Sequence, residues 1–179
     1  MANDVTAPIL SYEEINRRAD EFLKEHERGS TLPVDIEAIA EFDLGLDIFP
    51  FPGLQETFDL EGFISGNLTM IYVDEFIYYQ RPTRYRFTVA HEVGHYVIHS
   101  NLMAAIHPQS ASEWKRFTLG IDEETYGWLE YQAYTFAAAV LMPRWRCKDT
   151  SFMKSNCCNQ KLLMSEPRGF LPRDHRTTS

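Results

Sequence analysis

The chain has 179 residues, of which 44% are hydrophobic and 13% aromatic, and these values predict a folded domain with a substantial core. It contains no apolar run of about 18 residues, and its N-terminus lacks a basic or apolar signal sequence. We therefore expect a cytoplasmic protein with no membrane partner. The three cysteines (Cys147, Cys157 and Cys158) are too few for a disulfide framework or a four-cysteine zinc site.

The net charge of −9 is unevenly distributed along the chain. Residues 144–179 contain eight Lys and Arg against three Asp and Glu, which leaves −14 for residues 1–143. An acidic body repels the phosphates of nucleic acids, so we expect no direct nucleic-acid binding by this part. Because the charge changes sign at about residue 144, we expect a folded domain over 1–143 and a basic, solvated tail over 144–179.

The first half of the chain predicts two helices and a small sheet. A helix is expected over residues 12–27, with Ser11 and Glu14 forming a capping box at its start. A shorter helix follows Pro33 and closes before Gly45. Three short strands are predicted, over residues 46–50, 60–65 and 68–73. Residues 74–79 fit either a loop or a continuation of the third strand.

The second half of the chain predicts two long helices. Pro82 is a favourable first helical residue, and the helix that it opens should run to about His99. Residues 100–121 are interpreted as a connecting segment with one helical turn around Glu113. Asp122 should cap the last helix, which ends before Pro143.

The first long helix carries the motif His91-Glu92-Val93-Gly94-His95. Residues four apart on a helix are neighbours on one face, so the two imidazoles can converge on a single zinc ion. Glu92 then lies beside the open side of the metal, where a general base is needed. On a helical wheel His91 and His95 fall at the border of the apolar arc, and this border suits a catalytic cleft.

A catalytic zinc site needs a third protein ligand, and Glu130 is the candidate. On the wheel of the last helix Glu130 projects from the apolar side, although a buried carboxylate without a partner is costly. A metal ion held by His91 and His95 would be such a partner. The alternative is a buried ion pair of Glu130 with an arginine, namely Arg84, Arg86 or Arg116.

Two sequence blocks resemble the ImmA/IrrE family of metallo-endopeptidases. Residues 86–95 match the block R-F-T-x-A-H-E-x-G-H, and residues 130–143 match E-x-x-A-x-x-F-A-x-x-L-L-M-P with Val140 at the first Leu. Residues 33–40 are also similar to the opening helix of the family, so the resemblance covers about residues 10–143. It ends after Pro143, where family members often continue with further helices or with DNA-binding or sensory modules.

The resemblance implies a compact zincin-like α+β domain over residues 1–143. In it a small β-sheet packs against the helix that carries the motif and against a second helix that carries a ligand. By motif, His91, His95 and Glu130 are implied as ligands of Zn2+ and Glu92 as the catalytic base. Family members commonly cut helix-turn-helix repressors encoded beside them, in mobile elements and stress responses. The implied function is therefore a zinc endopeptidase with such a repressor as its partner and substrate.

Several alternatives remain open at this point. The chain could instead be a non-enzymatic protein that sequesters a transcription regulator, or a zinc hydrolase that acts on a small molecule. An additional donor for the oxyanion could come from a tyrosine near Glu130, namely Tyr126, Tyr131 or Tyr134. His99 supports the site from behind a ligand, faces the substrate, or is an ordinary histidine near a helix end. The strand over 68–73, if it lies at an edge of the sheet, could bind an extended substrate segment.

Overall fold

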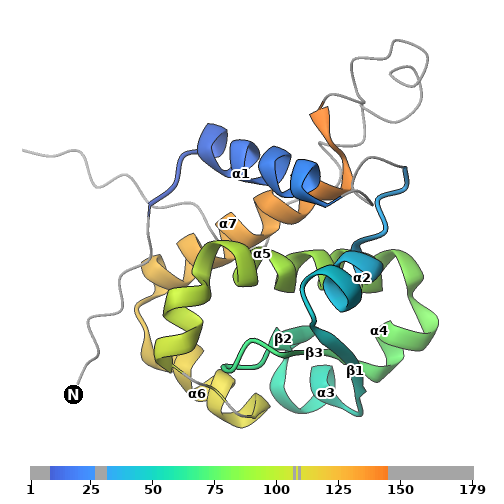
Figure 1. Ribbon diagram of the computed structural model, residues 1–179. Helices are drawn as coiled ribbons and strands as arrows, with labels where there is room; N and C mark the ends of the chain where they lie inside the picture. The colour runs from blue at the N-terminus through green and yellow to red at the C-terminus, as the bar shows by residue number, and fades with distance from the viewer. Residues whose placement is uncertain (1–8, 27–31, 107, 109, 145–179) are drawn as a thin grey trace, which may run out of the picture. The chain divides into compact units, whose positions relative to one another are not determined.

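The structure is a computed structural model that describes residues 9–26, 32–106, 108 and 110–144 (Figure 1). The chain divides into two compact units, Met1–Pro143 and Arg144–Ser179, and Arg144 is the one described residue of the second. The predicted basic tail and its three cysteines otherwise lie outside the described residues. The division into a peptidase domain and a tail therefore stays a prediction.

The first unit is mostly helical with a small mixed sheet, which confirms the predicted α+β class. Its elements are α1 (Tyr12–Glu25), α2 (Ile36–Ala38), the π-helical turn η2 (Ile39–Asp43), β1 (Asp47–Phe51), α3 (Leu54–Phe58), β2 (Gly62–Ile64), β3 (Met70–Asp74), α4 (Glu75–Gln80), α5 (Pro82–Ile106), α6 (Ala111–Gly120) and α7 (Glu123–Leu141). None of the described helices is long and apolar enough to cross a membrane.

The three strands form a sheet in the order β1-β3-β2. β1 runs parallel to β3, and β2 runs antiparallel to it, with Phe63 opposite Tyr72. The prediction that the strand over 68–73 could lie at an edge is therefore wrong, because β3 is the central strand and pairs on both sides. β1 pairs with β3 alone, and this edge position tolerates Pro50, which lacks a backbone N–H.

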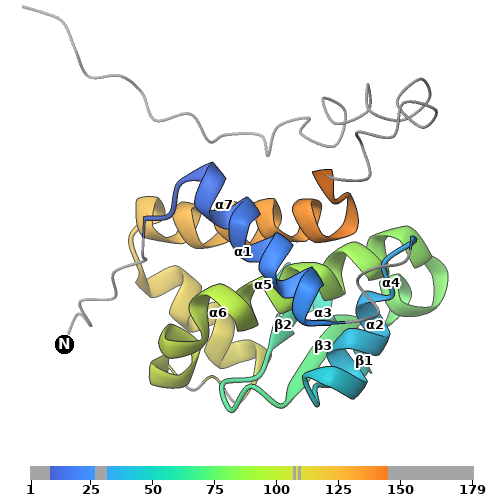
Figure 2. The same ribbon diagram turned by 45° about the horizontal axis from the view of Figure 1, so that its top comes forward.

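Helix α5 lies between the sheet and α7 (Figures 1 and 2). One side of α5 contacts β2 and β3, another side packs against α7, and α1 covers α7. The core between these layers is built from buried aliphatic and aromatic side chains, among them Ile71 and Val73 of β3, Val89 and Val93 of α5, and Phe136 and Val140 of α7. Because α5 contacts both layers, its side chains are held from two sides.

The start of α1 follows the sequence prediction only in part. Ser11 is the N-cap, and its Oγ accepts a hydrogen bond from the backbone N–H of Glu14 at 3.2 Å. The Glu14 carboxylate accepts hydrogen bonds from Arg17 instead of reaching back to Ser11, so the predicted reciprocal half of the capping box is wrong. These contacts with Arg17 lie at the surface, where they add little to stability.

Asp74 is the last residue of β3, and Glu75–Gln80 form helix α4, so residues 75–79 are neither the predicted loop nor a continued strand. Asp74 is the reason, because its buried carboxylate accepts hydrogen bonds from the backbone N–H groups of Phe76 and Ile77 at 3.0 and 3.3 Å. Its other oxygen accepts from the backbone N–H of Gln55 at 3.0 Å, at the start of α3. One side chain thus supports the starts of two short helices that the strand-like sequence does not predict.

The segment after the motif is also more helical than predicted. α5 continues to Ile106, and Met103 is fully buried in this extension. Residues 111–120, expected to contain a single turn, form α6 with Ser110 as its N-cap. The spacing of Ser110 and Glu113 is that of a capping box, so the sequence did contain a signal for this helix.

A close approach of α5 and α7 occurs at Gly94. A Cβ atom at this position would lie 3.0 Å from the backbone oxygen and 3.1 Å from the Cα of Ala133. Neither atom can move without shifting a helix, so only glycine fits here without separating the two helices.

We expect Gly94→Ala to lower the free energy of unfolding by about 1–3 kcal/mol, because the added methyl group overpacks the helix contact. Urea denaturation followed by circular dichroism measures this change. Gly120→Ala is the matched control, since a Cβ there has no neighbour within 4 Å. Equal stability of the two variants would contradict the close contact between the helices.

Candidate metal centre

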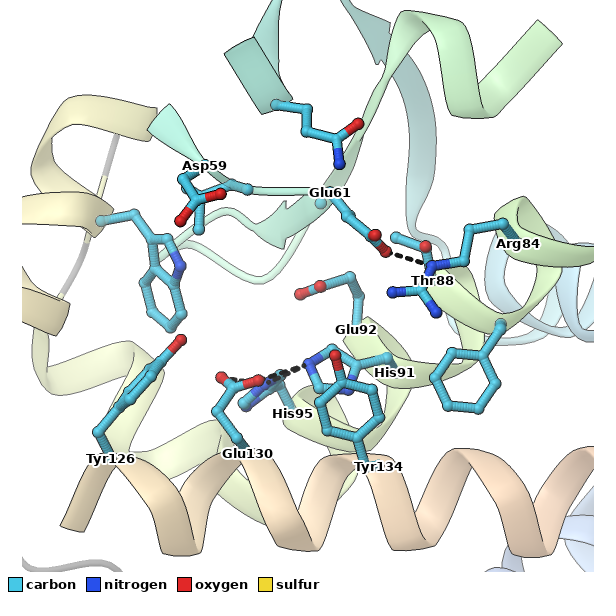
Figure 3. Close-up of a pocket in the computed structure, with 15 residues that line it drawn as sticks. Asp59, Glu61, Arg84, Thr88, His91, Glu92, His95, Tyr126, Glu130 and Tyr134 are labelled. Carbon is cyan, nitrogen blue, oxygen red and sulfur yellow. Dashed lines mark hydrogen bonds and ion pairs between the residues drawn. The ribbon is translucent and has the colours of Figure 1, made fainter. Parts of the chain in front are cut away.

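Three side chains from two helices converge at one point (Figure 3). His91 and His95 project from successive turns of α5, and their Nε2 atoms lie 3.1 Å apart. Glu130 reaches them from α7, with one carboxylate oxygen 3.3 Å from His91 Nε2 and the other 3.5 Å from His95 Nε2. The structure therefore brings together the three residues that the sequence predicted as metal ligands.

The spacing of these atoms fits a metal ion. One ligand atom from each of His91, His95 and Glu130 can be chosen so that all three lie within 4.8 Å of one another. Zinc bonds of about 2.0–2.1 Å in tetrahedral geometry separate neighbouring ligand atoms by about 3.3 Å. The observed separations of 3.1–3.5 Å bracket that value. Two imidazoles and one carboxylate are also a donor set typical of catalytic zinc sites.

The electrostatics of the group favour a positive charge at its centre. Burial raises the pKa of Glu130, but the charges of His91 and His95 and their hydrogen bonds outweigh burial and hold that pKa below its usual range. For His91 burial lowers the pKa, and the Glu130 carboxylate more than compensates, so the pKa of His91 is raised. Each partner thus stabilises the charged form of the other.

Glu92 lies beside this group, on the side of the sheet. Its side chain is buried, and this burial raises its pKa, while the charges of His91 and His95 act in the opposite direction. Strand β2 passes close to it, because a Cβ atom at Gly62 would lie 3.4 Å from Glu92 Oε1 and 2.7 Å from Thr88 Cγ2. The glycine therefore allows the edge of the sheet to approach the Glu92 carboxylate.

These four residues line a cavity of about 260 Å³ (Figure 3). Its walls come from α3, β2 and the segment between them, and from α5, α6 and α7. The other lining residues are Gln55, Asp59, Leu60, Glu61, Gly62, Arg84, Phe87, Thr88, Trp114, Tyr126 and Tyr134. Four of the lining residues are carboxylic acids and one is an arginine, so the cavity is acidic.

The arginines predicted as alternative partners of Glu130 are engaged elsewhere or do not contact it in the described structure. Arg84 Nε donates to Glu61 Oε2 at 2.5 Å, and Arg86 donates to the carbonyl of Val34 at 2.6 Å. Arg116 makes no ion pair with Glu130 among the described contacts. Glu130 therefore has the two histidines as its charged partners, and the alternative of a buried arginine pair is not borne out.

The ion pair of Glu61 and Arg84 at the rim of the cavity was not predicted. Its partners are 23 residues apart, and no local pattern in the sequence connects them. Trp114 also lines the cavity and places its ring 6.2 Å from that of His95. It was not recognised because its helix, α6, was not predicted at full length.

Two of the three candidate tyrosines line the cavity. Tyr126 and Tyr134 point into it from α7, and burial raises the pKa of both hydroxyls, so both stay protonated and able to donate (Figure 3). The Tyr134 ring also packs on His91, with centroids 4.4 Å apart. Tyr131 is 41% exposed and does not line the cavity.

The helix-borne histidines and glutamates around an acidic cavity are the arrangement of a metallopeptidase. Residues 43–149 match the family model of M78 peptidases, described as the IrrE N-terminal-like domain. The chain belongs to this family of metallopeptidases, in agreement with the resemblance found in the sequence. Searches of curated proteins and of solved structures gave no significant match.

Proposed function

We propose that this chain is a zinc-dependent endopeptidase that cleaves a helix-turn-helix transcriptional repressor. The observation that carries the proposal is the convergence of His91, His95 and Glu130 beside Glu92 in one acidic cavity. In this proposal residues 1–143 are the peptidase domain and residues 144–179 a separate tail. The protein acts in the cytoplasm, where its substrate works.

The proposed zinc ligands are His91 Nε2, His95 Nε2 and the Glu130 carboxylate. When bound, zinc supplies Lewis-acid chemistry, which makes water acidic near neutral pH and polarises a carbonyl group. Glu130 brings the single negative charge of the ligand set, and α7 fixes its position by packing against α5.

Glu92 is the proposed general base. It takes a proton from the attacking water and passes it to the nitrogen of the leaving amine. Its pKa is raised by burial, and this shift brings the carboxylate closer to the range in which it exchanges protons at neutral pH. Tyr126 and Tyr134 carry phenolic hydroxyls that face the cavity, and we propose that one of them stabilises the negative charge that develops on the scissile carbonyl.

The edge strand β2 is the proposed site for the substrate backbone. It pairs with β3 on one side, through the backbone bonds from Asp74 to Glu61 and from Ser65 to Met70. Since backbone groups of an antiparallel strand alternate in direction, those of Gly62 and Ile64 point away from β3, where the Ile64 N–H donates to the Glu92 carboxylate. Gly62 also lines the cavity, so an extended segment added to this edge would pass beside Glu92.

The choice of substrate rests on the resemblance to the ImmA/IrrE family, whose members commonly act on repressors encoded beside them. An acidic cavity and an acidic body also suit a basic, DNA-binding substrate. The alternative function is the sequestration of a regulator without cleavage. Glu92 argues against it, because a purely structural metal site has no use for a base at that position.

We expect Glu130→Gln to weaken zinc binding by more than about 100-fold. Changing a residue that only hydrogen-bonds to a metal ligand costs about 10–100-fold in affinity, and loss of a charged ligand itself should cost more. Competition with a chelating dye measures the Kd. Glu124→Gln, an exposed position on the same helix, is the control and should bind zinc like the wild type. Equal zinc affinity of the two variants would remove Glu130 from the ligand set.

We expect Glu92→Gln to reduce cleavage by at least about 100-fold while zinc stays bound, because the amide cannot accept the proton from water. The assay incubates the zinc-loaded protein with the repressor encoded beside its gene and follows a defined fragment by mass spectrometry. Metal content of both proteins is measured in parallel. Wild-type activity in Glu92→Gln would exclude this residue as the base.

The same assay separates the two functions. A stable complex with the repressor, formed by the wild type without any cut product, would support sequestration and reject the peptidase. A cut product from the wild type that disappears on removal of zinc with a chelator supports the peptidase.

A further inference from the structure

A row of buried polar side chains continues from the candidate metal centre into the protein. His95 Nδ1 lies 3.1 Å from His99 Nδ1, and His99 Nε2 lies 3.2 Å from Gln132 Oε1. All three residues are buried, with exposed fractions of 2%, 1% and 0%. His99 and Gln132 do not line the cavity, so they cannot touch a substrate there.

The positions of the protons in this row follow from the contact between Gln132 and His99. Gln132 Oε1 can only accept a hydrogen bond, so His99 Nε2 must carry a proton. His99 is buried between an imidazole and an amide, and a neutral ring is the inexpensive state in such surroundings. A neutral His99 with a proton on Nε2 has a lone pair on Nδ1.

The same reasoning applies one step nearer to the metal centre. One of the two facing Nδ1 atoms must donate, and His99 Nδ1 carries only a lone pair, so His95 Nδ1 is the donor. With Nδ1 engaged by His99, Nε2 is the ring nitrogen of His95 that is left to bind a cation. This atom faces His91 Nε2 at 3.1 Å and Glu130 Oε1 at 3.5 Å, where a cation would be bound.

We propose that His99 and Gln132 are positioning residues that hold His95 through its Nδ1–H, so that its Nε2 is directed at the metal centre. The inference rests on the zinc site of the proposed function. Metal-bound histidines usually donate their second N–H to a carboxylate, a backbone carbonyl or water. Here a histidine and an amide take that role, and they do so without adding a charge to the buried side of the site.

His91 is held in a different way. Its Nδ1 atom is buried and has no hydrogen-bond partner among the described residues. Its ring instead packs on Tyr134, with the ring planes at 53°. The two histidine ligands are therefore unequal, and the preferred tautomer is set by hydrogen bonds at His95 alone.

Helix α7 supplies both ends of this arrangement. Glu130 faces the metal centre, and Gln132, two residues later, contacts His99 behind it. Ala133, the next residue of α7, lies against Gly94 of α5. The helix contact that fixes the position of Glu130 therefore also fixes that of Gln132.

The first test observes the tautomer directly in the metal-free wild-type protein. Long-range proton–nitrogen NMR of the imidazole rings distinguishes Nδ1–H from Nε2–H, and the His95 signals are assigned by their loss in His95→Gln. We expect a proton on Nδ1 of His95 and, in His99, a proton on Nε2 but not on Nδ1. A His95 ring without a proton on Nδ1 would overturn the inference.

The second test measures the zinc Kd of variants by chelator competition. Gln132→Met keeps the length of the side chain but removes the oxygen, and we expect zinc binding to weaken about 10–100-fold. Thr135→Val is the matched control, a buried polar position on the same helix outside the row, and should leave the Kd unchanged. An unchanged Kd in a folded Gln132→Met protein would contradict the proposed role.

A double variant separates positioning from general damage to the core. If His99 and Gln132 act in series, Gln132→Met adds little further loss of zinc affinity once His99→Phe is present. Independent losses that simply add would indicate two unrelated structural effects and reject the row as a unit.

None of these measurements uses a substrate, so the role of His99 and Gln132 is tested separately from the peptidase activity. A wild-type protein that binds zinc but cuts no repressor would reject the peptidase and leave the row intact. If the wild type bound no zinc, the peptidase would again fail, and the tautomer of His95 would still decide whether His99 and Gln132 act as proposed.

Discussion

The contact between α5 and α7 at Gly94 and Ala133 is the constraint on which the site depends. Each helix alone carries an incomplete set of groups, two imidazoles on α5 and one carboxylate on α7. At a backbone approach that admits no side chain at Gly94, Glu130 comes within 3.3–3.5 Å of both rings. A separation larger by one methyl group would move the half-buried Glu130 carboxylate away from the two imidazoles, and their charged forms would no longer stabilise one another. Helix packing and site electrostatics therefore stabilise one another.

The sequence predicted the parts of the site that follow from helical periodicity. His91 and His95 are one turn apart, and Glu130 falls on the apolar side of a helix whose start, at Asp122, is marked by a capping residue. Both facts need only the geometry of an isolated helix. The same reasoning left the role of His99 open, because periodicity cannot say what lies opposite a side chain. That answer depends on Gln132, 33 residues later, which reaches His99 only through the packing of α7.

The errors in the fold have a related cause. Residues 76–79, Phe-Ile-Tyr-Tyr, are typical of a strand, yet they form α4 because Asp74 caps the helix and also binds the start of α3. The order of the strands was likewise beyond local patterns. β3 has the same alternating sequence whether it lies at the centre or at an edge, and only the parallel pairing with β1 places it at the centre. In α4 a local preference for a strand is overridden, and in β3 the local pattern leaves the position in the sheet open. Both outcomes are decided by contacts between residues that are distant in the sequence.

The ion pair of Glu61 and Arg84 at the rim of the cavity affects the charge partners of Glu130 at its centre. Arg84 is the one arginine that lines the cavity, and it is engaged by Glu61. The cationic partners of Glu130 among the described residues are therefore imidazoles, which are weaker bases than arginine and can give up a proton to bind a cation. A guanidinium in contact with Glu130 would neutralise the carboxylate permanently and occupy the space between the helices. By holding Arg84 at the rim, Glu61 leaves the negative charge of Glu130 available to a metal ion.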